Sequence, residues 1–225
     1  LDTVAPGISF SLDNDSGSDN EDWVTNHNLL SVSGITDDSA KIKVTLISGT
    51  TVLDTKEISP SSNSWTYSYA TNLDDGRYTL RVESTDIAGN TFSESQELVI
   101  DTVVRNEFTL VSDSGSLDND QITNAEKLVF SGTTDNDATV RLTVKAIGGD
   151  TLHNYTPTVN VDTGQWSFEF PDVLSEGQYI IVVTATDVAG NTNISSDYDI
   201  TIDRTPPLLS GIELDSSDDT GAIGD

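Results

Sequence analysis

The sequence predicts an all-β protein in which β-sandwich domains follow one another as an elongated rod. Apolar and polar residues alternate with a period of two in segments such as 8–12, 41–46, 65–69 and 78–82, and this alternation is typical of strands with one buried face. No segment of the sequence combines the helical period with capping residues. The same order of segments occurs twice along the chain, which indicates tandem domains.

The internal repeat sets the domain boundaries. Gly34 and Trp65 return as Gly132 and Trp166 roughly a hundred residues later, and units of that size are independent domains rather than solenoid repeats. The boundaries that follow are a first domain at 1–101, a second domain at 102–203, and the N-terminal stub of a third at 204–225.

Each unit contains about seven short strand signals separated by turn residues, which is the pattern of an immunoglobulin-like sandwich. In the first unit the expected strands are 8–12, 29–33, 41–47, 51–57, 65–70, 77–84 and 91–100. The second unit repeats the pattern, most clearly at 128–130, 140–144, 166–170 and 179–184. We interpret Trp65 and Trp166, which fall at equivalent strand positions, as core residues. Tyr78 and Tyr179 fit a tyrosine corner.

Composition and charge exclude several classes of function. The 225 residues include 38 acidic and 10 basic side chains, a formal charge of −28, which argues against binding to nucleic acid or to an anionic membrane. The chain has no Cys, so disulfides and thiolate metal sites are unavailable. No apolar run is long enough to cross a bilayer, and we expect no membrane insertion. Because Met is absent even at position 1, we expect an internal piece of a longer protein.

The acidic residues are concentrated in a run at 13–22, which returns in altered form at 113–120 and, as a third copy, at 215–219. Carboxylates this dense repel one another in a folded loop unless a cation neutralises them, and hard oxygen ligands suit Ca²⁺. The run could also be solvated surface, and a single Asp in a turn often caps its own backbone. Calcium is the interpretation that accounts for the uncompensated charge.

Several short motifs resemble those of tandem bacterial Ig-like domains in giant non-fimbrial adhesins of the SiiE type, which leave the cell by type I secretion. In the first unit these motifs are Asp15-Ser16-Gly17, Ser33-Gly34-Ile35-Thr36-Asp37, Asp75-Gly76-Arg77-Tyr78 and Thr85-Asp86-Ile87-Ala88-Gly89-Asn90. The second unit has counterparts at 131–135, 176–179 and 186–191. The resemblance implies a calcium-bound, rod-like stalk that is secreted or held on the bacterial surface.

An Ig-like sandwich places the loop after its first strand at the end where the chain leaves, so the acidic run should face the next domain. We therefore expect calcium at the junction between domains, at a half-site on the free N-terminal end and at a second junction beyond residue 203. A separate site within the acidic loop itself is an alternative. The expected ligands are Asp2, Asp13, Asp15, Asp19, Asp22, Asp37, Asp74, Asp75, Asp86, Asn90, Asp101, Asp113, Asp118, Asp120, Asp135, Asp137, Glu176, Asp187, Asn191 and Asp203.

Catalysis is not expected, because the sequence has no nucleophile motif and only two scattered His residues. The favoured function is a calcium-stiffened stalk of a bacterial surface adhesin involved in virulence. Its partners would be neighbouring domains of the same monomeric chain, and the parent protein would bind glycans or proteins of a host cell. The alternative is a module that itself binds a glycan or protein receptor. The region 148–162, which differs most between the repeats, would then be the place to look.

Overall fold

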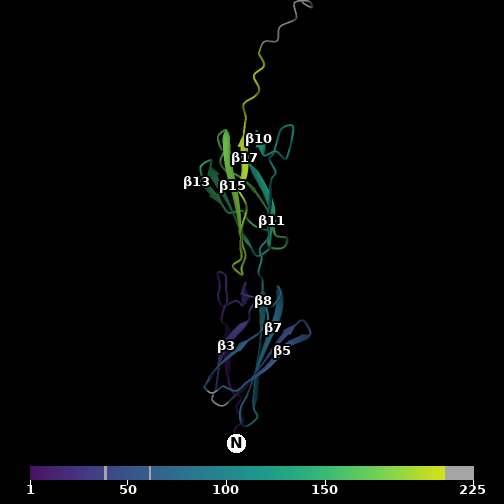
Figure 1. Cartoon of the computed structure of the whole chain (residues 1–225), viewed down its shortest axis with the longest axis vertical. Coiled ribbons are helices and arrows are strands. Elements are labelled where there is room, and N and C mark those ends of the chain that lie inside the picture. Colours follow the sequence, from purple (N-terminus) through teal and green to yellow (C-terminus); the bar gives the residue numbers. More distant parts are fainter. Residues whose placement is uncertain (38–39, 61, 211–225) are drawn as a thin grey trace, which may run out of the picture.

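The computed structural model describes residues 1–37, 40–60 and 62–210, and within them it consists of two β-sandwiches stacked end to end (Figure 1). The first strand of the chain belongs to the lower domain in that view, and the chain leaves the upper domain at the opposite pole. The expected all-β class is confirmed. Most of the expected stub, including the third acidic copy at 215–219, lies outside the described residues.

Domain 1 is formed by eight strands in two sheets. The strands are β1 (Ile8–Leu12), β2 (Val24–Thr25), β3 (Ser31–Thr36), β4 (Lys41–Ser48), β5 (Thr51–Ile58), β6 (Ser64–Ser68), β7 (Gly76–Thr85) and β8 (Thr91–Ile100). One sheet has the order β1-β3-β6 and the other β2-β8-β7-β4-β5. All pairs are antiparallel except β2 and β8, where Val24 pairs in parallel with Val99.

Domain 2 repeats this arrangement with one difference at its last strand. Its strands are β9 (Asn106–Leu110), β10 (Ile122–Thr123), β11 (Val129–Thr134), β12 (Thr139–Ala146), β13 (Thr151–Tyr155), β14 (Gln165–Glu169), β15 (Gly177–Thr186), β16 (Thr192–Ile194) and β17 (Tyr198–Ile202). The sheets are β14-β11-β9 and β10-β17-β15-β12-β13, with β16 also paired to β15. The two short strands β16 and β17 therefore replace the continuous β8 of domain 1.

Alternation of side chains builds a separate core inside each sandwich. On β4, Ile42, Val44 and Leu46 point inward and are fully buried, whereas Lys41 and Lys43, which alternate with them, face solvent. The buried residues fall into one cluster per domain, with an additional small cluster around Val104 near the joint. Because each domain buries its own apolar faces, each has the core that independent folding requires.

Each core contains a tryptophan packed on a glycine of the neighbouring strand. Trp65 of β6 is paired with Gly34 of β3, and Trp166 of β14 is paired with Gly132 of β11. A Cβ atom on either glycine would overlap with the indole ring. The core assignment of both tryptophans is confirmed by exposed fractions of 3% and 4%.

The expected tyrosine corner is present in both domains. The hydroxyl of Tyr78 donates to the carbonyl of Asp74 over 2.7 Å, and that of Tyr179 donates to the carbonyl of Ser175 over 3.1 Å. Each bond ties the start of a central strand to the turn before it. These turns lie at the end of the domain where the chain leaves, and they therefore help to shape the joint.

The expected and the observed strands differ most clearly at three places. The strand expected at 29–33 is β3 and runs to Thr36, because the apolar pair at 29–30 belongs to the preceding turn, where Leu29 is exposed. The parallel strand β2 was not anticipated, since two residues are too few for a periodic signal. In domain 2 the strand expected at 166–170 is β14, Gln165–Glu169, and Phe170 lies beyond it in the core.

Candidate cation-binding joint between the domains

Two loops from different domains meet at the joint. From domain 1 comes the acidic loop, residues 13–23, between β1 and β2. From domain 2 comes the Ala-Gly-Asn turn, Asp187–Asn191, between β15 and β16. In Figure 1 the loops reach toward each other between the sandwiches. The hydroxyl of Ser16 donates to the carbonyl of Ala189 over 2.7 Å, so the domains are joined by a direct bond as well as by the chain.

Glycine allows the two backbones to approach this closely. Gly17 has φ +96°, and a Cβ atom there would overlap with the carbonyl oxygen of Val188. Gly190 has φ +90° and packs against the backbone of Gly17. Such positive φ values favour glycine, and the contact leaves no room for a side chain. The interface therefore depends on a Ser-Gly pair on one side and an Ala-Gly pair on the other.

Asp187 is the most deeply buried carboxylate of the joint, with 6% of the residue exposed. Asn191 donates to both of its oxygens, from the backbone nitrogen to Oδ1 and from Nδ2 to Oδ2, each over 2.8 Å. The same Nδ2 also donates to the carbonyl of Asp101 over 2.8 Å. One asparagine thus fixes the turn and connects it to the interdomain segment.

Other carboxylates surround this position without compensating positive charge. Burial raises the pKa of Asp101, and the nearby charges of Asp187, Asp75 and Asp137 raise it further. Burial also raises the pKa of Asp137, together with the charges of Asp187 and Asp135. The ion pairs found in the described part of the chain involve none of these residues. Each pKa shift reports that the ionised form is disfavoured at the joint.

Two further carboxylates hold the interdomain segment in place. Oδ1 of Asp75 accepts hydrogen bonds from the nitrogen and the hydroxyl of Thr102, over 3.1 and 2.9 Å. Oδ2 of Asp135 accepts one from the nitrogen of Arg105 over 2.9 Å. Asp75 belongs to domain 1 and Asp135 to domain 2, so the segment between them is clamped from both sides.

The structure therefore places six of the expected ligands around one joint. These are Asp75, Asp101, Asp135, Asp137, Asp187 and Asn191. Among residues 1–37, 40–60 and 62–210, however, no three His, Cys, Asp or Glu side chains are already arranged as a metal cage. The joint offers oxygen donors in the right chemical class for Ca²⁺, and binding would require their side chains to rotate toward one point.

In the acidic loop, the carboxylates bond mainly to the backbone of the loop itself. Oδ2 of Asp15 accepts from the nitrogen of Trp23, while its Oδ1 is buried without a hydrogen-bond partner. Burial is the main cause that raises the pKa of Asp15, and the charges of Asp22 and Asp19 add to it. Asp19 and Asp22 each cap a backbone nitrogen two residues ahead. These carboxylates form a group within the loop.

Asp13 bonds to the hydroxyl of Ser31 on β3. The contact with domain 2 is made by Ser16 and Gly17, which were not among the expected functional residues. The repetition of that pair as Ser114-Gly115 was the sequence signal that could have identified it.

The remaining expected ligands lie at the two poles or in turns. At the N-terminal pole of domain 1, Asp2 and Asp37 cap the nitrogens of Val4 and Gly7, and Asp86 is bonded to Asn90. At the C-terminal pole of domain 2, the residues that accept backbone or hydroxyl hydrogen bonds are Asp113, Asp120, Glu176 and Asp203. Asp118 is exposed in the loop between β9 and β10, and Asp74 accepts the tyrosine-corner bond through its carbonyl.

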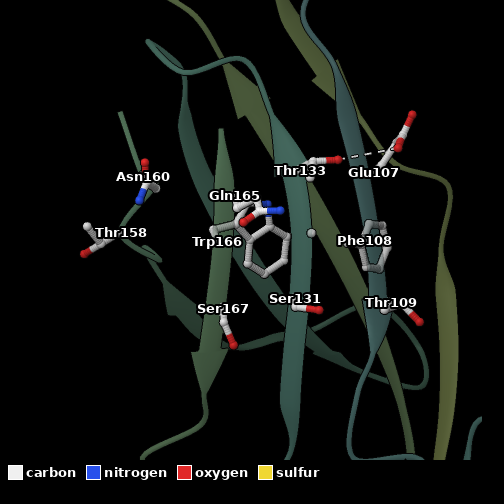
Figure 2. Close-up of a pocket in the computed structure, with 11 residues that line it drawn as sticks. Glu107, Phe108, Thr109, Ser131, Thr133, Thr158, Asn160, Gln165, Trp166 and Ser167 are labelled. Atoms are coloured by element: carbon white, nitrogen blue, oxygen red, sulfur yellow. Dashed lines mark hydrogen bonds between the residues drawn. The ribbon is translucent and has the colours of Figure 1, made fainter. Parts of the chain in front are cut away.

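A shallow groove lies on the outer face of the three-stranded sheet of domain 2. Figure 2 shows small polar side chains along β9, β11 and β14, with Thr158 and Asn160 on the neighbouring segment. The equivalent face of domain 1 has a similar hollow, lined by Ser9, Ser33 and Thr66 among others. The groove is thus common to both repeats and does not distinguish one domain as a receptor-binding module.

Several solved structures are similar to this chain in fold. They include a tetra-tandem repeat in the extending region of a large adhesion protein, with 20% identity over 89% of this chain and 50% of that one, and a TM-score of 0.41. A 1.5-MDa bacterial ice-binding adhesin gives 18% identity over 89% of this chain and 65% of that one, with a TM-score of 0.40. The present chain therefore spans about half the length of the first of these structures.

The fibronectin(III)-like modules of CbhA from Clostridium thermocellum are covered completely, with 13% identity over 90% of this chain and a TM-score of 0.40. At these identities the likeness concerns the fold alone. No curated protein matches the chain. Within the described residues, no helix is long and apolar enough to span a bilayer.

The family assignment rests on the sequence itself. Residues 3–102 and residues 103–204 each match the family described as bacterial Ig-like domain. The two matches follow one another with no gap and together include nearly the whole chain. They coincide with the two sandwiches and with the joint at Asp101. The chain therefore belongs to the bacterial Ig-like domain family, of which it carries two tandem copies.

Proposed function

We propose that these two domains are a spacer segment of a large bacterial surface adhesin and that Ca²⁺ bound at the joint makes the spacer rigid. The observation that carries the proposal is the position of Asp187. Its carboxylate is removed from water between the domains, beside Asp101 and Asp137, with no basic partner. A divalent cation bound by oxygen ligands would supply the missing positive charge.

Electrostatics gives the reason for rigidity. Two like unit charges about 5 Å apart repel by roughly 3 kcal/mol at an effective dielectric constant near 20. Repulsion of this kind among Asp101, Asp137 and Asp187 opposes the close approach of the two domains. A bound cation reverses the sign of the local interaction and holds both domains to the same centre. The unbound joint is then the weaker and more flexible one.

The spacer role also agrees with the tandem repeat and with the acidic charge of the chain. The immediate partners of each domain are the neighbouring repeats, and the negative charge disfavours binding to nucleic acid and to anionic lipids. Low calcium inside the bacterium would leave the joints unbound and flexible during type I secretion, and calcium outside would stiffen them. We place the protein at the cell surface, as a monomeric, non-catalytic stalk whose parent chain contacts host glycans or proteins elsewhere.

Calorimetric titration with CaCl₂ and small-angle scattering test the proposal on the whole chain. We expect saturable calcium binding. When EGTA is added, the maximum dimension should shorten or the distribution of interatomic distances should broaden. In the double variant Asp137→Asn, Asp187→Asn the joint site should lose calcium. The matched control is Asp162→Asn, which removes a charge from an exposed loop of the same domain. Absence of calcium binding in the unmodified chain would rule the proposal out.

A further inference from the structure

We propose that the N-terminal pole of domain 1 is a docking surface for the Ser-Gly turn of another bacterial Ig-like repeat. The inference deepens the proposed spacer function, because it identifies the partner surface and the residues that select it. The surface consists of the Ala-Gly-Asn turn of domain 1, Asp86–Asn90, between β7 and β8. Its counterpart in domain 2 is the turn already occupied by Ser16 and Gly17.

The two turns are built by the same hydrogen bonds. Asn90 donates from its nitrogen and from Nδ2 to the two oxygens of Asp86, each over 2.8 Å, and these distances equal those between Asn191 and Asp187. Nδ2 of Asn90 also donates to the carbonyl of Asp2 over 3.3 Å. This bond reproduces the connection of Asn191 to Asp101. The pole therefore has the shape of the joint before a partner is present.

Exposure separates the free turn from the occupied one. Ile87 and Ala88 at the tip of the free turn are both exposed, Ile87 to 86%. At the equivalent positions of the occupied turn, Val188 is half-buried and Ala189 is fully buried. A Cβ atom on Gly89 would meet nothing within 4 Å, whereas Gly190 lies against Gly17. The two turns therefore differ in exposure because a partner loop covers one of them, and not because the turns themselves are built differently.

The partner is identified by the loop that occupies the other turn. It must present a Ser hydroxyl to the carbonyl of Ala88, and the next residue must be Gly, since a side chain there would overlap with the turn, as it would at Gly17. The C-terminal pole of domain 2 carries the same pair, Ser114-Gly115. Gly115 has φ +121°, and among the described residues a Cβ atom there would meet only the carbonyl oxygen of Leu117, at 3.9 Å. The two poles of the chain are therefore complementary halves of one joint.

The hydroxyl of Ser114 shows what changes on docking. It lies 3.0 Å from the hydroxyl of Thr123 and accepts a hydrogen bond from the backbone nitrogen of Asn124, also over 3.0 Å. Ser16 has the equivalent threonine and asparagine partners. Ser16 donates its proton across the joint to Ala189, but Ser114 donates to Oδ1 of Asn124 over 2.9 Å. In the unpaired loop the donor has been satisfied internally. Docking would redirect it to the carbonyl of the incoming turn.

A concatenated chain tests the inference, because it creates the new joint with the full protein on both sides. Residues 1–202 are followed directly by residues 2–225 of a second copy, so that Asp2 takes the place of Asp203. The probe is Ile87→Cys in the second copy, which is the only thiol since the chain has no Cys. Its rate of reaction with a maleimide is compared with that of Ile87→Cys in the two-domain chain.

We expect concatenation to slow the reaction at position 87 by about tenfold or more, because docking must open before the thiol is accessible. The rate should approach that of Val188→Cys in the two-domain chain, which reports the existing joint. Ile35→Cys, exposed on the outer sheet face, should react at the same rate in both chains. Gly115→Val in the first copy should restore fast labelling at position 87. An unchanged rate on concatenation would overturn the inference.

Calcium distinguishes this inference from the proposed function. The labelling is carried out with CaCl₂ and with EGTA. Protection under both conditions supports the docking surface and contradicts calcium as the source of rigidity. Protection with CaCl₂ alone supports both proposals. Lack of protection under either condition overturns the docking surface and leaves calcium binding to be judged by calorimetry.

Discussion

Asp187 is a carboxylate that folding removes from water without giving it a counter-charge. Its neighbours Asp101 and Asp137 have raised pKa values for the same reason, and Asp15 shows the same effect in the acidic loop. While they are ionised and no cation is bound, these carboxylates destabilise the folded state. We therefore expect a ligand at the joint to offset that destabilisation.

The raised pKa values predict an unusual dependence of stability on pH. Between the ordinary Asp value of 3.8 and the raised values of Asp15, Asp101 and Asp137, the folded chain holds protons that the unfolded chain has released. Stability in EGTA should therefore increase as the pH falls from neutral into that window, and should be lost again as the pH rises through the raised values. Thermal unfolding followed by circular dichroism should show a melting temperature that rises as the pH is lowered from 7 into that window.

Two comparisons test the assignment of this effect to the joint. With saturating CaCl₂ the dependence should reverse, since protons then compete with the cation for the carboxylates. The double variant Asp101→Asn, Asp137→Asn should show a flatter profile in EGTA. A melting temperature in EGTA that only declines on acidification would contradict the prediction.

At the scale of the strands, the contact between a tryptophan and a glycine is the feature most sensitive to change. Gly34→Ala would place a methyl group against the ring of Trp65 and the carbonyl of Ser9, and Gly132→Ala would do the same with Trp166 and Glu107. Overpacking of this kind typically costs about 1–3 kcal/mol. Urea denaturation should show that loss for each variant. Ile35→Ala, one residue along the same strand and 60% exposed, should have little effect.

The strands also show how far sequence reasoning reaches. The alternation on β4 and β7 correctly predicted which side chains face the core, because one face of each strand is buried and the other is exposed to solvent. The interruption between β16 and β17 was not predictable, since the hydroxyl of Ser195 there accepts a hydrogen bond from the nitrogen of Val183 in place of a backbone carbonyl. The parallel pair β2 and β8 depends on contacts distant in sequence. Such tertiary contacts leave no periodic signal.

The candidate site was predictable in part for a similar reason. The topology of the sandwich correctly brought Asp101, Asp187 and Asn191 to one joint. It could not show that Asp19 and Asp22 would cap their own loop, because Asp caps and Asp ligands look alike in a sequence. The role of Ser16 was also hidden, since a single hydroxyl carries no charge pattern.

At the scale of the whole molecule, the relative position of the domains depends on the absence of a side chain at Gly17. Gly17→Ala should disrupt the joint, because the new methyl group overlaps with the carbonyl of Val188. Small-angle scattering in CaCl₂ should then show a broader distribution of interdomain distances. Gly49→Ala is the matched control, since Gly49 also has a positive φ, +58°, but has open space around it. Gly49→Ala also places a side chain at a positive φ, but it should leave the distribution of interdomain distances unchanged. Equal scattering from both variants would contradict this account of the joint.

The interrupted last strand of domain 2 has a consequence for a spacer under tension. The chain enters and leaves each sandwich at opposite poles (Figure 1), so a pull along the axis shears the last strand against its neighbour. In domain 1, β8 is paired with β7 from Thr91 to Ile100 without a break. In domain 2, β17 is paired with β15 only from Tyr198 to Ile202. We predict that domain 2 unfolds at a lower force than domain 1 in single-molecule pulling. Domain 2 would then lengthen the chain under load while domain 1 stays folded.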